Sequence, residues 1–142
     1  MSFDTVMKSF ASQNDMDELD FRDNTYFLTL DDAIEAACFQ ANGNCYIHGI
    51  LASLPEGNSA REQLLVDLLK TSLALIYSHR VSLCLEPDGK QLALYLIRPL
   101  REFDEIELEN ALIEFINAYE VLKQVIDQQQ RFTASGPMML MP

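Results

Sequence analysis

The side chains best suited to nucleophilic or metal chemistry in this 142-residue chain are three cysteines and two histidines. A cysteine beside a histidine can act as a nucleophile, and cysteines with histidines can ligate zinc. Cys38 and His48 could be brought together across adjacent strands. However, the sequence has neither the Cys-x-x-Cys nor the His-x-x-x-His spacing that zinc sites use. It also has no Gly-x-Ser-x-Gly elbow and no glycine-rich phosphate loop.

We therefore expect no catalytic residue, no metal ion and no cofactor, and we interpret Cys38, Cys45 and Cys84 as small packing residues. A cysteine-dependent enzyme built on Cys38 and His48 is the alternative from a different functional class. Three dispersed cysteines favour a reducing compartment over a disulfide framework. The chain begins without a basic and apolar leader, and no apolar run is long enough to cross a bilayer, so we expect a cytoplasmic protein.

The chain is strongly acidic. Ten basic residues against 22 acidic ones give a formal net charge of −12. Repulsion between this charge and phosphate groups argues against nucleic acid and against anionic membrane surfaces as partners. Hydrophobic residues nevertheless make up 49% of the chain. The protein therefore combines a solubilising charge with apolar side chains that a partner could cover.

Hydrophobic periodicity predicts the first elements. A helical period covers residues 3–13, and an acidic link follows over 14–23. Alternating or continuous apolar runs, separated by turn residues, then predict three antiparallel strands, over 25–30, 33–40 and 45–51.

A second helix is predicted from about residue 60 to residue 77, opened by a capping box of Ser59 and Glu62. Its apolar residues cover an arc of roughly 220°, about twice what a one-sided surface helix needs. One sheet cannot cover that arc, so we expect a partner subunit to cover the rest and the protein to be a homodimer. The interface residues that we predict are Leu65, Leu69, Leu73 and Ile76.

The last part of the domain is a hairpin followed by a helix. The turn 86–89 (Glu-Pro-Asp-Gly) has proline where φ is preset and glycine where φ must be positive. Asp104 and Glu107 form a capping box before a helix that we expect to end near Asp127. Residues 128–142 have no period, so we predict a flexible C-terminal tail.

Together these elements predict a single α+β domain over residues 1–127. Its order is helix, three antiparallel strands, helix, two-stranded hairpin and helix, with one layer of helices on an antiparallel sheet.

This organisation resembles the class I type III secretion chaperones, small acidic bacterial proteins whose chains close with two strands and a helix. The resemblance is carried by 94–100 (Leu-Tyr-Leu-Ile-Arg-Pro-Leu), a leucine-rich strand with a Pro-Leu step, and by 103–105 (Phe-Asp-Glu), an acid-started helix. It implies a homodimer, or occasionally a heterodimer, without ATPase activity that wraps the N-terminal segment of a secreted effector and holds it in a non-globular, secretion-competent state. Some members of the family instead sequester regulators of secretion gene expression, and that is the alternative function.

The resemblance also implies where a partner would bind. Extended segments bind by adding a strand to a sheet edge and by docking apolar anchors, so exposed apolar side chains mark the surface. The anchors that we predict lie on the first helix, the first three strands and the last helix: Val6, Phe10, Phe27, Phe39, Tyr46 and Ile113.

Overall fold

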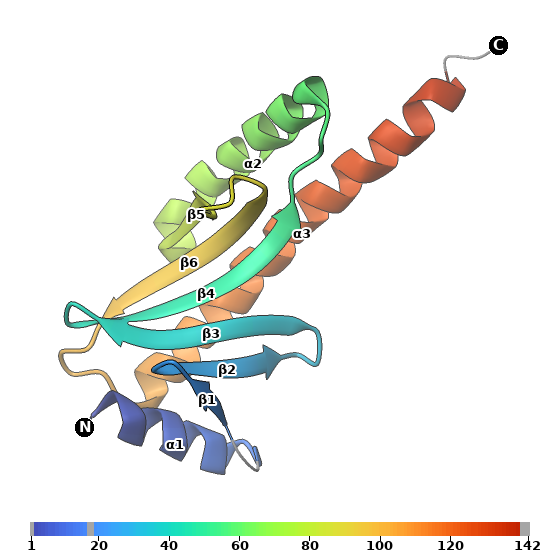
Figure 1. Cartoon of the computed structure of the whole chain (residues 1–142). Coiled ribbons are helices and arrows are strands. Elements are labelled where there is room, and N and C mark those ends of the chain that lie inside the picture. Colours follow the sequence, from blue (N-terminus) through green and yellow to red (C-terminus); the bar gives the residue numbers. More distant parts are fainter. Residues whose placement is uncertain (1, 17–18, 140–142) are drawn as a thin grey trace.

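The computed structural model describes residues 2–16 and 19–139, which form a six-stranded antiparallel sheet with three helices (Figure 1). The strand order is β1-β2-β3-β4-β6-β5. The predicted α+β class, with helices layered on an antiparallel sheet, is confirmed. In chain order the elements are α1 (Phe3–Gln13), β1 (Asp20–Arg22), β2 (Thr25–Leu30), β3 (Ile34–Ala41), β4 (Asn44–Ser53), α2 (Asn58–His79), β5 (Val81–Leu85), β6 (Gln91–Pro99) and α3 (Glu105–Met139).

The acidic link expected over residues 14–23 contains strand β1, so the prediction of three strands before α2 was wrong in number. β1 pairs with β2 through a tight turn at Asp23 and Asn24, whose φ angles are 52° and 59°. Asp and Asn tolerate this left-handed conformation, and two such residues in a row match the twist of a hairpin. β1 has three residues and no buried side chain, so it carries no periodic signal in the sequence.

The C-terminal hairpin belongs to the same sheet. β6 pairs with β4 on one side and with β5 on the other, which makes it a central strand. The predicted turn is present, because the Gly89 N–H donates to the Glu86 carbonyl at 2.9 Å and Gly89 has a φ of 69°. Central position explains the leucine-rich sequence of β6, whose Leu92, Leu94 and Leu96 are all buried.

The start of α2 differs from the sequence prediction. Gly57 is the N-cap residue and no side chain caps the helix, so the capping box of Ser59 and Glu62 is wrong. Ser59 lies inside the first turn instead. The start of α3 agrees better, since the Asp104 carboxylate accepts a hydrogen bond from the Glu107 N–H at 2.9 Å. Asp104 is therefore the N-cap that the sequence predicted.

α3 is longer than expected. It continues to Met139, so the predicted end near Asp127 was wrong. The glutamines that follow Asp127 are good helix formers and prolong a helix without an apolar period. The flexibility predicted for residues 128–142 stays a prediction.

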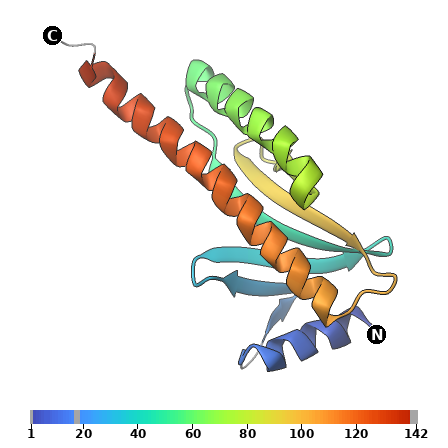
Figure 2. The ribbon, with the colours of Figure 1, turned by 180° about the vertical axis from the view of Figure 1, so that it is seen from behind.

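All three helices lie on one face of the sheet, which we call the inner face (Figure 2). α3 approaches β4 closely at Gly49, where an added Cβ would stand 2.8 Å from Cζ of Phe115. Phe115 is fully buried. Because glycine has no side chain, α3 can lie directly on the strand at Gly49.

α3 also hydrogen-bonds to β4 where that strand has lost a neighbour. The last register pair between β3 and β4 is Ala37 with His48, and β4 continues past it. There the Tyr119 hydroxyl donates to the Ile50 carbonyl at 2.9 Å, and Lys123 Nζ donates to the Leu51 carbonyl at 3.0 Å. Side chains of α3 thus satisfy carbonyls that a strand would otherwise pair.

None of the helices in the described ranges is both long and apolar enough to cross a membrane.

Candidate functional site

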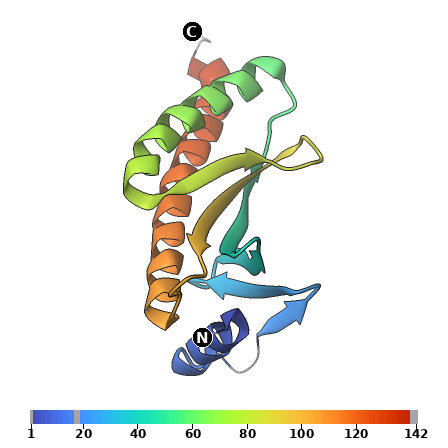
Figure 3. The ribbon, with the colours of Figure 1, turned by 90° about the vertical axis from the view of Figure 1, so that its left-hand side faces the viewer.

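The face of the sheet opposite the helices, which we call the outer face, is left open by the described helices (Figure 3). Strand alternation gives it two cross-strand rows of side chains. The first row is Thr25, Phe39, Tyr46 and Ile97, and the second is Phe27, Ala37, His48 and Tyr95.

Aromatic rings are prominent in both rows. In the first row, Phe39 and Tyr46 stack with centroids 5.1 Å apart and ring planes 5° from parallel. In the second row, Phe27 is 38% exposed, and the Arg22 guanidinium lies over its ring, 4.6 Å from the ring centroid. Partly exposed aromatic rings in a contiguous row form a surface that a partner can cover with a gain in stability.

His48 belongs to this outer face. Its Nε2 lies 2.6 Å from Glu86 Oε1, so the pair connects β4 with the turn between β5 and β6. The His48 ring also packs against Tyr95, with centroids 4.6 Å apart. His48 therefore helps to hold the rows in place.

The structure separates Cys38 from His48. Cys38 pairs in register with Ile47, the neighbour of His48, so the two side chains point to opposite faces of the sheet. Burial raises the pKa of the fully buried Cys38 thiol far above its usual range, which disfavours the thiolate that a nucleophile needs. The pairing proposed for a cysteine-dependent enzyme is therefore wrong. In the described residues no three His, Cys, Asp or Glu side chains gather to hold a metal ion; the side chain of His79 lies outside those residues.

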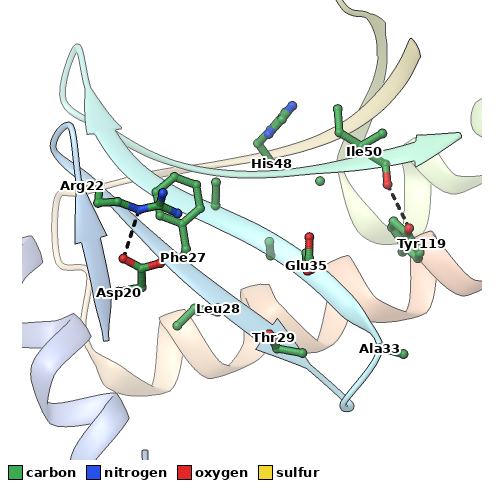
Figure 4. A pocket seen from close by; sticks show the side chains of 13 residues that line it. Asp20, Arg22, Phe27, Leu28, Thr29, Ala33, Glu35, His48, Ile50 and Tyr119 are labelled. Atoms are coloured by element: carbon green, nitrogen blue, oxygen red, sulfur yellow. Dashed lines mark hydrogen bonds and ion pairs between the residues drawn. The ribbon is translucent and has the colours of Figure 1, made fainter. Parts of the chain in front are cut away.

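The second row contains a hollow, because Ala37 is small where its neighbours are large. The hollow has a volume of about 570 Å³ and lies between Phe27 and Arg22 on one side and Ile50 on the other (Figure 4). Glu35 stands on β3 beside it. We call it the Ala37 hollow.

A second hollow, of about 530 Å³, lies between α1 and the β1–β2 hairpin. Phe21 of β1 is 48% exposed there, and its ring centroid is 4.5 Å from that of Tyr26. The Tyr26 hydroxyl donates to Asp4 Oδ1 at 2.5 Å. Burial, with a further contribution from this hydrogen bond, raises the pKa of Tyr26 to about 12. Phe21 was missed from the sequence because its segment was taken for a link.

The predicted partner-binding residues divide into two groups. Val6 and Phe10 are buried on the inner side of α1, so the structure places them in the core and corrects their assignment as surface anchors. Helical spacing identifies an apolar face but does not say what covers it. Phe27, Phe39 and Tyr46 lie together on the outer face, and Ile113 is exposed elsewhere, on α3. Their binding role stays a prediction.

Three outer-face residues were not predicted: the exposed Ile50 and Ile97, and the half-buried Tyr95. Period-two alternation carried a signal for all three, since Ile50 alternates with the buried Leu51 along β4, and Tyr95 and Ile97 alternate with the buried Leu94 and Leu96 along β6.

α2 presents a separate apolar stripe. Leu69 and Leu73 are 56% and 63% exposed, and Val66 is exposed one turn earlier, whereas Leu65 is half-buried. Leu64 and Leu68 are buried on the opposite side. The wide apolar arc is thus covered on one side only, as predicted. The side chain of Ile76 lies outside the described residues, and the interface role of all four predicted residues stays a prediction.

Comparison with known protein families gives a match over residues 5–123, from α1 to Lys123 of α3. The chain belongs to the Tir chaperone protein (CesT) family. The resemblance to the class I type III secretion chaperones, inferred from the sequence, is thereby confirmed. The outer face, the Ala37 hollow and the α2 stripe lie within the matched region, whereas the last part of α3 lies beyond it.

Solved structures with the fold of this CesT-family chain are distant in sequence. A chain of the HopA1–SchA chaperone–effector complex is 17% identical with a TM-score of 0.65, over 86% of this chain and 93% of that one. A chain of the Yersinia pestis type III secretion chaperone SycH with a stable fragment of YscM2 is 15% identical with a TM-score of 0.63, over 85% and 99%. YbjN from E. coli is 13% identical with a TM-score of 0.64, over 91% and 94%. No curated protein sequence gives a significant match.

Proposed function

We propose that this CesT-family protein is a type III secretion chaperone that binds a non-globular segment of a secreted effector or of a secretion regulator and keeps it competent for secretion. The observation that carries the proposal is the outer face, where partly exposed aromatic rows lie on a sheet that the described helices cover on one side only. The separation of Cys38 from His48 removes the one catalytic pair that the sequence offered, so binding without catalysis is the function that we propose.

The edges and charge of the sheet support this function. β1 and β5 are its edge strands, and each has a neighbour on one side only. An extended segment can add to such an edge and place alternate side chains against the apolar rows. Because the segment loses conformational entropy on binding, it needs a large contact area, which two hollows and two rows provide. The net charge of −12 keeps the apolar surface soluble before it is covered.

We also propose that the chain forms a homodimer through α2. Val66, Leu69 and Leu73 make one stripe on the helix surface, at the spacing of neighbouring turns. Covering the stripe with a second copy would remove three large aliphatic side chains from water, each worth about 1.5–3 kcal/mol when fully buried.

The test is co-expression of the chain with the protein encoded by the neighbouring gene, followed by size-exclusion chromatography with light scattering. We expect a stoichiometric complex. Changing Phe39 and Tyr46 together to Ser should weaken capture by roughly 30-fold, as loss of aromatic hot-spot residues does. The matched control changes two exposed residues of α3 that are not among the predicted anchors, Ile106 and Val121, in the same way.

Both double variants should keep the oligomeric state of the wild type and a cooperative melting transition. Undiminished capture by the Phe39 and Tyr46 variant, with capture lost in the α3 control, would move the binding surface to α3. A wild-type chain that captures no secreted protein or regulator would contradict the proposed function itself.

A further inference from the structure

We infer that the Ala37 hollow receives a basic side chain, arginine or lysine, of the bound segment, with its cation against the Glu35 carboxylate. The inference rests on the proposed function, because it specifies the chemistry of a segment that the chaperone would hold. It is carried by the shape of the hollow and by the charges that line it (Figure 4).

The shape suits a long side chain with an apolar stem. Ala37 is the small residue between Phe27 and His48 in the second row, and the Gly49 backbone also lines the hollow. Phe27 and Ile50 supply apolar walls and are both partly exposed. Lysine and arginine place their methylene groups on such surfaces while the charged end reaches a polar partner.

The charge suits a cation. Four of the five charged or titratable groups at the hollow already have partners: Asp20 is paired with Arg22, His48 with Glu86, and the Tyr119 hydroxyl with the Ile50 carbonyl. Among the described residues, the Glu35 carboxylate has neither a hydrogen-bond nor an ion-pair partner. It is therefore the negative charge that remains for a ligand.

Tyr119 cannot take the place of that ligand. Its hydroxyl donates to the Ile50 carbonyl at 2.9 Å, so its proton is not available to Glu35. Burial and then the nearby negative charge of Glu35 raise the pKa of Tyr119. Glu35 thus acts on its neighbours as an uncompensated charge at the edge of a partly enclosed hollow, where a cation would be attracted more strongly than on an open surface.

The experiment titrates the full-length protein with small probes and follows the backbone amide signals of Ala37 and Gly49 by NMR. The probes are N-acetyl-arginine amide, N-acetyl-lysine amide and the uncharged N-acetyl-citrulline amide, which has nearly the shape of the arginine probe. We expect both cationic probes to bind more tightly than the citrulline probe, by up to about fivefold, the size of one exposed ion pair.

Glu35→Gln should abolish this preference, and the matched variant Glu109→Gln, which removes an exposed carboxylate from α3, should keep it. Ala37→Leu should fill the hollow and weaken all three probes. Equal binding of charged and uncharged probes by the wild type, or an unchanged preference in Glu35→Gln, would overturn the inference.

Partner capture separates this inference from the proposed function. If the wild type captures its partner but does not prefer the cationic probes, only the inference about the hollow fails. If the cationic probes bind at Ala37 and Gly49 but no partner is captured, the proposed function fails while the cation preference stands.

Discussion

Replacing Gly49 with alanine should destabilise the fold, because α3 leaves no room for a Cβ atom at this position. An added Cβ would stand 2.8 Å from Cζ and 3.4 Å from Cε1 of Phe115, and 3.2 Å from the Glu35 carbonyl oxygen. Carbon atoms in contact prefer separations of about 3.5–4.0 Å. Because Phe115 is fully buried, its ring has no free space into which it can withdraw.

Two opposing effects set the size of the change. Overpacking a well-filled core costs about 1–3 kcal/mol. Glycine loses more backbone entropy on folding than alanine, so its replacement returns about 0.5–1 kcal/mol. We therefore expect Gly49→Ala to lower the free energy of unfolding by about 1–2 kcal/mol, with the steric effect the larger of the two.

The measurement is urea unfolding at one fixed protein concentration, because a dimer would make stability depend on concentration. Phe115→Leu supplies the control. If the clash is with the ring, the double variant should be more stable than the sum of the single changes by about 1 kcal/mol. Unaltered or increased stability of Gly49→Ala would refute the reasoning, and so would strict additivity with Phe115→Leu.

Three further predictions concern the dimer, the thiols and alkaline stability. Leu69→Asp combined with Leu73→Asp should give a monomer by light scattering, whereas Ile106→Asp should remain a dimer; a persistent dimer in the double variant would place the interface elsewhere. In the native protein iodoacetamide should modify Cys84, which is half-buried, and reach the other two cysteines only after unfolding, as mass spectrometry would reveal. Tyr26 has a pKa raised from 10.0 to about 12, so it ionises first in the unfolded chain: its contribution to stability is complete below pH 10.0 and is lost as the pH rises towards 12. Tyr26→Phe should therefore make the free energy of unfolding fall less steeply over that range, and an equal slope would contradict the assignment.

The parts of the fold that the sequence predicted are those where one side of an element is buried. In β2, the residues on either side of Phe27 are buried while Phe27 itself is exposed, as period-two alternation requires. A shift of one residue would have moved the whole apolar set of the strand to the open face, so the register is strongly determined. The turn at Gly89 was predicted because its positive φ restricts the residue type at that position, and few residues other than glycine adopt it.

The parts that could not be predicted depend on contacts between distant elements. The Ala37 hollow combines residues from β1, β2, β3, β4 and α3. Ala37 and Gly49 are unremarkable in the sequence, and their small size acquires meaning only once Phe115 and Phe27 are placed around them. β1 was missed because three exposed residues carry no periodicity. Phe21, which lies on β1, was therefore not predicted as a surface residue.

The mistaken assignment of Val6 and Phe10 shows how the binding surface arises. Core residues and partner-binding residues are of the same apolar types and recur at the same spacing, so the sequence alone does not distinguish them. The distinction depends on how many helices are available to cover each face of the sheet. Here three helices cover one face of a six-stranded sheet, and the apolar side of α1, which includes Phe10, packs on that same face. No described helix remains for the outer face, so the aromatic rings of Phe39 and Tyr46 stay partly open. The surface on which we propose partner binding therefore follows from a shortage of covering helices on a sheet with two apolar faces.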